Sequence, residues 1–91
     1  MDQGGGSETQ VTDLGAWLKQ ETAKDPLANR LVEEVLKPSK VMSAKAAAAV
    51  LKRRVKTVRR RVDALKAKGL IVQTAAGIAT TPLFGRVVSM P

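Results

Sequence analysis

The sequence contains no cysteine, no histidine and no tyrosine, and its aromatic side chains are limited to Trp17 and Phe84. Without cysteine and histidine the chain has no disulfides, no zinc site of the usual Cys/His type, no thiol nucleophile and no imidazole for acid–base chemistry. The scarcity of aromatic residues argues against a surface that stacks successive unpaired bases. We therefore expect a protein that is not an enzyme and that needs no cofactor or metal.

Long apolar runs are also missing. No stretch approaches the roughly 20 residues that cross a bilayer, and the glycine-rich start lacks the pattern of a signal peptide. With 91 residues, the chain has room for one small hydrophobic core. We expect a soluble intracellular protein with no membrane partner and no small-molecule substrate.

The chain divides into three parts by composition. Residues 1–10 contain three adjacent glycines and no apolar side chain after the first methionine, which predicts a disordered tail. Residues 11–24 are predicted to form an N-terminal helical extension, because an apolar stripe recurs there at helical spacing. Residues 25–91 are predicted to form the main domain. The stripe of the extension consists of Leu14, Trp17 and Leu18.

Three helices are predicted in the first part of the main domain. Asp25 is a good N-cap and is followed by a proline at the first helical position, and Pro38 prevents continuation of that helix. Ser43 is a second N-cap, ahead of an alanine-rich run. A third helix over about residues 54–68 has an apolar stripe on one side and ends at Gly69. One continuous helix over residues 43–68 is the alternative. The stripe consists of Val55, Val58, Val62 and Leu65.

The C-terminal part changes to β-type composition. Residues 70–74 and 86–90 are rich in β-branched residues and are predicted to be extended, with a shorter extended piece around residues 78–81. The tight turn is predicted at residues 75–77, Ala-Ala-Gly. The sequence thus predicts three helices followed by a hairpin.

Positive charge is concentrated in the second half. Residues 1–38 carry four cations and seven anions, a net charge of −3, whereas residues 39–91 carry twelve cations and one anion, a net charge of +11. Nine of these cations lie within residues 52–68. Like charges at this density repel one another along a helix, and a polyanion such as double-stranded DNA would relieve the repulsion.

A helical wheel of the third helix separates its basic residues from its apolar stripe. At about 100° per residue, Arg59 and Arg61 flank the side that points away from the stripe. Arg54 lies nearer the stripe. The outward side itself carries Arg53, Lys56, Thr57, Arg60 and Ala64.

The stretch TVRRRVDALKAKGLIV, from Thr57 to Val72, resembles the recognition helix and first wing strand of winged helix-turn-helix domains such as the MarR and ArsR repressor groups. This resemblance implies an α+β fold with a three-helix core, a β-hairpin wing and an N-terminal helical extension. It implies a non-catalytic protein that places the basic helix of residues 54–68 in the major groove of double-stranded DNA. Such a protein acts as a transcriptional regulator or as a small chromatin-type protein, and we expect it to be cytoplasmic and associated with the nucleoid.

The resemblance also assigns roles to single residues. Base edges would be contacted by Lys56, Thr57 and Arg60. Phosphates would be contacted by Lys45, Arg53, Arg54, Arg59 and Arg61, and Arg86 is an additional cation in the predicted hairpin. The wing turn carries no cation, which favours a structural role for the hairpin over insertion into the minor groove.

Three alternatives remain open at this point. The basic helix could belong to a ribosomal or other RNA-binding structural protein, or to a winged helix that docks an acidic protein partner. Trp17 could cover the domain's own core or lie in the interface of a homodimer. The candidate dimer contacts are Leu14, Trp17 and Leu18.

Overall fold

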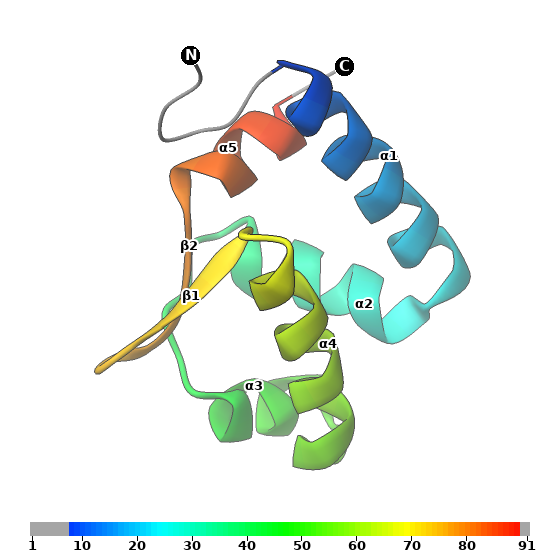
Figure 1. Ribbon diagram of the computed structural model, residues 1–91. Helices are drawn as coiled ribbons and strands as arrows, with labels where there is room; N and C mark the ends of the chain where they lie inside the picture. The colour runs from blue at the N-terminus through cyan, green and yellow to red at the C-terminus, as the bar shows by residue number, and fades with distance from the viewer. Residues whose placement is uncertain (1–7, 90–91) are drawn as a thin grey trace.

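Helices interrupted by one β-hairpin make up the computed structural model, which describes residues 8–89 (Figure 1). The elements are α1 (Glu8–Lys24), α2 (Pro26–Leu31), the π-helix η1 (Val32–Leu36), α3 (Ala44–Leu51), α4 (Val55–Ala67), β1 (Ile71–Thr74), β2 (Gly77–Thr80) and α5 (Pro82–Val88). Within the described residues the fold is α+β and mostly helical, with five α-helices and a single two-stranded antiparallel sheet.

Helix α1 begins at Glu8, earlier than predicted. Residues 8–10 of the expected disordered tail are therefore helical, and the rest of that tail lies outside the described residues. Val11, which the predicted stripe did not include, is buried together with Leu14 and Leu18. Burial of a third apolar side chain favours the longer helix, because tertiary packing provides most of the stability of a helix in a protein.

The two N-caps predicted from the sequence are confirmed. The Asp25 carboxylate accepts the backbone N–H of Leu27 at 3.1 Å and begins α2, and a proline occupies the first position of that helix. The Ser43 hydroxyl accepts the backbone N–H of Ala46 at 3.0 Å and begins α3. Each cap satisfies one of the N–H groups that have no partner at a helix start.

A sharp turn separates α3 from α4, which excludes the alternative of one continuous helix. Lys52 ends α3 in the left-handed conformation with φ of 56°, and α4 starts three residues later at Val55. The guanidinium of Arg30 on α2 donates to the carbonyl of Leu51 at 2.9 Å and also pairs with Glu34. This contact satisfies a carbonyl at the end of α3 and attaches the turn to α2.

The hairpin after α4 has the predicted tight turn. The antiparallel register of β1 and β2 runs from Ile71 opposite Thr80, at the open end, to Thr74 opposite Gly77, beside the turn. A residue between η1 and α3 joins the same sheet, because Ile78 donates its N–H to the carbonyl of Met42 at 2.8 Å. At Gly77 a Cβ would lie 2.4 Å from the backbone of Met42, so glycine is what allows the two segments to approach.

The strand predicted over residues 86–90 is wrong: most of this segment belongs to α5, and residue 90 lies outside the described chain. The Thr81 hydroxyl accepts the N–H of Phe84 at 3.4 Å and the next residue is a proline, which is the same start signal as in α2. Leu83, Phe84 and Val87 then bury one side of the helix. Helical spacing of these three residues outweighs the β propensity of two adjacent valines.

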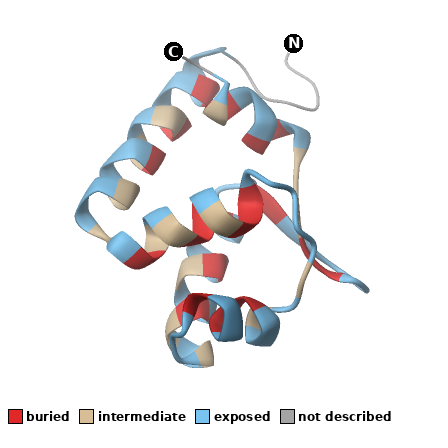
Figure 2. Ribbon diagram, turned by 180° about the vertical axis from the view of Figure 1, so that it is seen from behind, coloured by how far each residue is buried: buried red, intermediate tan, exposed pale blue. Residues whose placement is uncertain are grey.

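All the elements share one core (Figure 2). Its fully buried residues include Leu31, Leu36, Leu51, Leu70 and Ile78. Helices α1 and α5 pack against each other at one end of the molecule, and α3 with the first turns of α4 forms the other end (Figure 1). The predicted extension of residues 11–24 is therefore part of the core of the domain. No helix in the described part of the chain is long and apolar enough to cross a bilayer.

Candidate nucleic-acid interface

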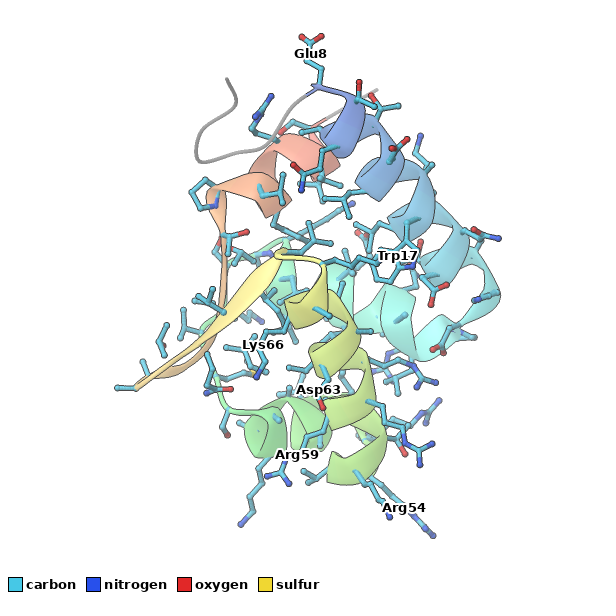
Figure 3. The ribbon with its side chains drawn as sticks, viewed as in Figure 1. Glu8, Trp17, Arg54, Arg59, Asp63 and Lys66 are labelled. Carbon is cyan, nitrogen blue, oxygen red and sulfur yellow. The ribbon has the colours of Figure 1, made fainter. Side chains whose placement is uncertain are left out.

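Eight exposed cations lie on α3, on the turn after it and on α4, and all except Lys66 in the last turn of α4 gather at one end of the molecule. We call these seven the basic surface; it consists of Lys45, Lys52, Arg53, Arg54, Lys56, Arg59 and Arg60. Within residues 8–89, none of the seven forms an ion pair with a carboxylate. Figure 3 shows Arg54 and Arg59 at the end of the molecule that α3 and α4 form, with Glu8 at the opposite end. The charge asymmetry of the sequence is thus also an asymmetry in space.

The exposed side of α4 follows from its buried side. Val58, Val62 and Leu65 are buried, as the apolar stripe predicts. Lys56 and Arg60, four residues apart, are exposed on the other side of the helix. The core thus holds α4 in an orientation that presents two of the predicted base-contacting residues to solvent.

Thr57, the third predicted base contact, is half-buried and lies at the margin of this exposed side. It is less exposed than Lys56 and more exposed than the buried Val58, its two neighbours on a helix that packs against α3. A hydroxyl and a methyl group at this position are still partly open to solvent. Thr57 therefore borders the basic surface and is less exposed to solvent than Lys56.

The start of α4 adds further positive potential. Arg54 occupies the N-cap position with extended backbone, and its side chain makes no capping hydrogen bond. The first N–H groups of the helix therefore have no capping side chain from Arg54, and two arginines directly precede them. This end of a helix carries a partial positive charge, so the local field of α4 and the arginine charges have the same sign.

Arg61 has a different environment from the other predicted phosphate contacts. Its guanidinium donates to the carboxylate of Asp25, the N-cap of α2. Burial alone would raise the pKa of Asp25, but the hydrogen bond and charge of Arg61 and the N–H groups of Leu27 and Ala28 outweigh burial, and the pKa is lowered. The pair attaches α4 to α2, which places Arg61 outside the basic surface.

Two further cations lie away from the basic surface. Arg86 is on α5, at the far end of the molecule from α3, because the segment that carries it is helical and not part of the hairpin. Lys68 lies over the ring of Trp17, with 5.3 Å between its Nζ and the ring centroid. Arg86 is therefore not brought together with the other predicted DNA contacts.

Two of the three candidate dimer contacts are buried in the core of a single chain. Leu14 and Leu18 are buried in the core, with exposed fractions of 8% and 7%. Trp17 is partly buried against the same core and borders a small hollow between α1, α2 and α4. The first of the two roles considered for Trp17, covering the domain's own core, agrees with this placement.

Sequence reasoning missed the contacts that hold the basic surface in place. Arg30 donates to Glu34 at 2.8 Å, and this hydrogen bond raises the pKa of Arg30 and lowers that of Glu34. The spacing of these two residues along a helix was a usable signal for their pairing. The hydrogen bonds from Arg30 to Leu51 and from Arg61 to Asp25 join residues far apart in sequence, so no local sequence pattern predicts them.

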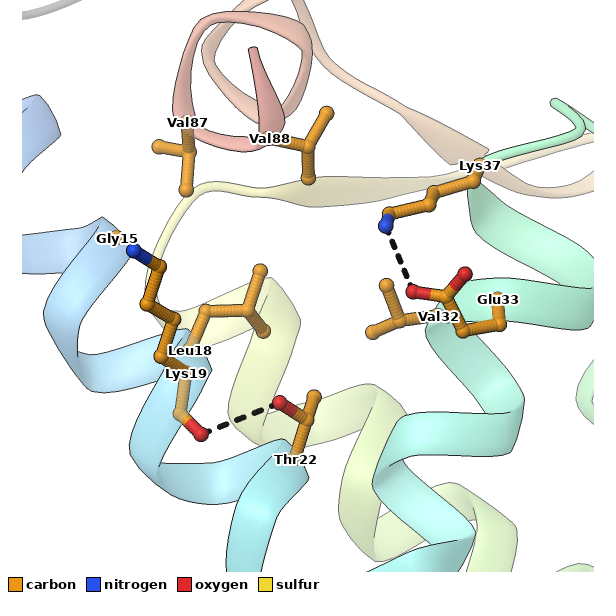
Figure 4. A pocket seen from close by; sticks show the side chains of 9 residues that line it. All are labelled: Gly15, Leu18, Lys19, Thr22, Val32, Glu33, Lys37, Val87 and Val88. Carbon is orange, nitrogen blue, oxygen red and sulfur yellow. Dashed lines mark hydrogen bonds and ion pairs between the residues drawn. The ribbon is translucent and has the colours of Figure 1, made fainter. Parts of the chain in front are cut away.

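A cleft of about 130 Å³ lies elsewhere, between α1, η1 and α5 (Figure 4). Leu18, Val32 and Val87 supply apolar surface, and Lys37 at the rim pairs with Glu33 at 2.7 Å. None of the seven residues of the basic surface lines this cleft. Among residues 8–89 no group of three or more potential metal ligands occurs either. The basic surface is therefore the candidate functional site.

Comparison of the chain with models of known protein families, with curated proteins and with solved structures finds no match. The candidate site therefore depends on the geometry described above.

Proposed function

We propose that this protein binds double-stranded DNA through the basic surface, with α4 in the major groove. The observation that carries the proposal is the set of seven exposed cations without a carboxylate partner in the described residues, all on one helix–turn–helix unit. Mutual repulsion makes such a surface costly, and the phosphates of a duplex remove that cost while counterions are released.

The order of elements supports a winged helix-turn-helix as the form of this interface. A helix, a bridging residue at Met42, two helices and a hairpin follow one another, and the bridging residue pairs with the second strand of the hairpin. In such domains the second helix of the pair enters the major groove, and here that helix is α4. Its exposed side is held outward by the core and by the bonds of Arg30 and Arg61.

Some residues of the basic surface are proposed to contact base edges and others to contact phosphates. Lys56 and Arg60 on the exposed side of α4 contact base edges, with Thr57 at the margin. Lys45, Arg53, Arg54 and Arg59 contact phosphates and fix the register of the helix in the groove. Arg61 has a structural role, because its charge is committed to Asp25.

The hairpin is proposed to close the core and to make no minor-groove insertion. Its turn consists of Ala75 and Ala76, both exposed and without charge. Minor-groove insertion typically uses an Arg, Lys, Asn or Gln side chain or a large apolar wedge, and neither turn residue supplies one. DNA binding is thus assigned to the two helices, and the protein acts without catalysis as a transcriptional regulator or as a small chromatin-type protein.

Fluorescence anisotropy with three labelled polyanions tests the proposal. The expected order of affinity is a duplex DNA first, then a structured RNA hairpin, with an acidic polypeptide such as polyglutamate last. The double variant Arg53→Ala/Arg54→Ala should lose most of the duplex affinity. The control Lys19→Ala/Lys24→Ala, which removes two cations from α1, should bind the duplex about as well as the unmodified protein. Preferential binding to RNA or to polyglutamate, or equal losses in both variants, would contradict the proposal.

A further inference from the structure

The basic half of the chain contains one carboxylate, Asp63, and the proposed function does not use it. Asp63 is exposed in the middle of α4, between Arg59 and Lys66 along the helix (Figure 3). It is surrounded by cations three and four residues away, the spacing at which helical ion pairs form. Yet among residues 8–89 Asp63 forms no ion pair, and no hydrogen bond of its carboxylate is found.

Asp63 lies in line with the proposed base-contacting residues. Lys56, Arg60 and Asp63 are spaced by four and three residues, so they form one ridge along the exposed side of α4. At 1.5 Å and 100° per residue, Asp63 lies about 10.5 Å along the axis from Lys56 and only about 20° around it. That distance corresponds to about three base-pair steps of 3.4 Å.

Short side chains beside Asp63 leave room for another molecule to approach its carboxylate. Ala64 and Ala67, two exposed neighbours of Asp63, have side chains of a single methyl group, and Lys66 is an exposed cation three residues further along. A long side chain at either alanine position would keep a base edge away from the short aspartate side chain. On the helical wheel Ala64 and Ala67 lie on the same outward side as Lys56 and Arg60, whereas Lys66 lies on the other flank of Asp63, nearer the buried stripe. Short side chains therefore border Asp63 on the side that would face the groove.

We infer that Asp63 reads a cytosine in the DNA site by accepting a hydrogen bond from its exocyclic N4 amino group; this inference depends on the proposed function. Phosphates repel a carboxylate, so Asp63 weakens binding to DNA in general, and a base-edge donor in the groove compensates for that loss. Cytosine is the favoured base because adenine presents the N7 acceptor beside its N6 amino group, where it repels the second carboxylate oxygen. The site should therefore contain a cytosine within about three base pairs of a guanine contacted by Lys56 or Arg60.

A purely structural role for Asp63 makes a different prediction. In that case the carboxylate would only reduce repulsion among the cations of α4, and its removal would change stability without changing base preference. The substitution Asp63→Asn separates the two roles. It keeps the size of the side chain, removes the charge and adds an amide donor, and asparagine prefers adenine through a bidentate contact to N6 and N7.

In vitro selection from a randomised duplex library tests the inference with the full chain. The unmodified protein should select a cytosine at one position, and Asp63→Asn should change that position to adenine. Asp63→Asn should also bind the duplex selected by the unmodified protein roughly 5- to 100-fold more weakly. The control Asp13→Asn, which removes a charge from an exposed position on α1, should select the original cytosine.

The outcomes separate this inference from the proposed function. Selection of the same base by the unmodified protein and by Asp63→Asn overturns the role of Asp63 and leaves DNA binding in place. Binding of duplexes without any base preference in the unmodified protein does the same. Failure of the unmodified protein to bind duplex DNA overturns both.

Discussion

At the scale of single residues, the ion pair between Arg61 and Asp25 joins α4 to the start of α2. Asp25 has two functions at once, because one carboxylate oxygen caps α2 and the other accepts from Arg61. Both side chains are partly exposed, at 21% for Asp25 and 34% for Arg61, so water screens part of the attraction. The pair therefore contributes more to the orientation of α4 than to the total stability.

The substitution Asp25→Asn should reveal this pair through its pH dependence. Asparagine keeps a capping oxygen and loses the charge, so we expect the free energy of unfolding to fall by about 0.5–1 kcal/mol at neutral pH. The pKa of Asp25 in the folded protein is lowered relative to its unfolded value of about 3.9. The contribution is therefore full above about pH 4–5 and is lost as the pH falls through the folded pKa. Urea unfolding at a series of pH values should show the two proteins converging in acid; a difference that persists there would contradict this assignment.

Two glycines should respond in opposite directions to the same substitution. Gly77→Ala places a Cβ against the backbone of Met42 at a residue with φ of 132°, so we expect a loss of more than about 2 kcal/mol. Gly85→Ala, in α5, adds a Cβ with no atom within 4 Å and should stabilise the protein by about 0.5–1 kcal/mol. Thermal unfolding of both variants measures the contrast. Similar stabilities would show that the hairpin does not depend on the approach to Met42.

At the scale of elements, local sequence signals predicted most of the helix starts, buried faces and turns. The caps at Asp25 and Ser43, the buried stripe of α4 and the turn of the hairpin all follow from short patterns. Helix α5 was missed because two valines suggested a strand, although its Thr-Pro start signal was present. The outward side of α4 was predictable from its period. The ion pair between Arg61 and Asp25 could not be predicted from the sequence, because it depends on how two helices dock.

The turn between α3 and α4 offers a test at this scale. Lys52 adopts the left-handed conformation, which costs a residue with a Cβ about 1 kcal/mol relative to glycine. Lys52→Gly should therefore stabilise the fold by about 0.5–1 kcal/mol while removing one cation from the basic surface. Lys45→Gly removes the same charge from a helical position and should destabilise by a similar amount. Chemical denaturation of the two variants gives the sign; destabilisation by Lys52→Gly would mean that the turn changes when its lysine is removed.

At the scale of the whole molecule, charge and packing are divided between the two ends. Helices α1 and α5 close the core at one end, and the basic surface occupies the other (Figure 3). Residues 39–91 carry a net charge of +11 against −3 for residues 1–38, so the chain has a strong electrostatic asymmetry. A polyanion that approaches this molecule is attracted to α3 and α4 and repelled from the acidic N-terminal part.

The salt dependence of duplex binding measures the central claim most directly. We expect the logarithm of the affinity to fall linearly with the logarithm of the salt concentration. The four phosphate contacts assigned to the basic surface correspond to a slope of about −3.6. In the variant Arg53→Ala/Arg54→Ala, the loss of two contacts should make the slope less steep by about 2. A slope near zero, or a slope that this variant leaves unchanged, would contradict DNA binding through the basic surface.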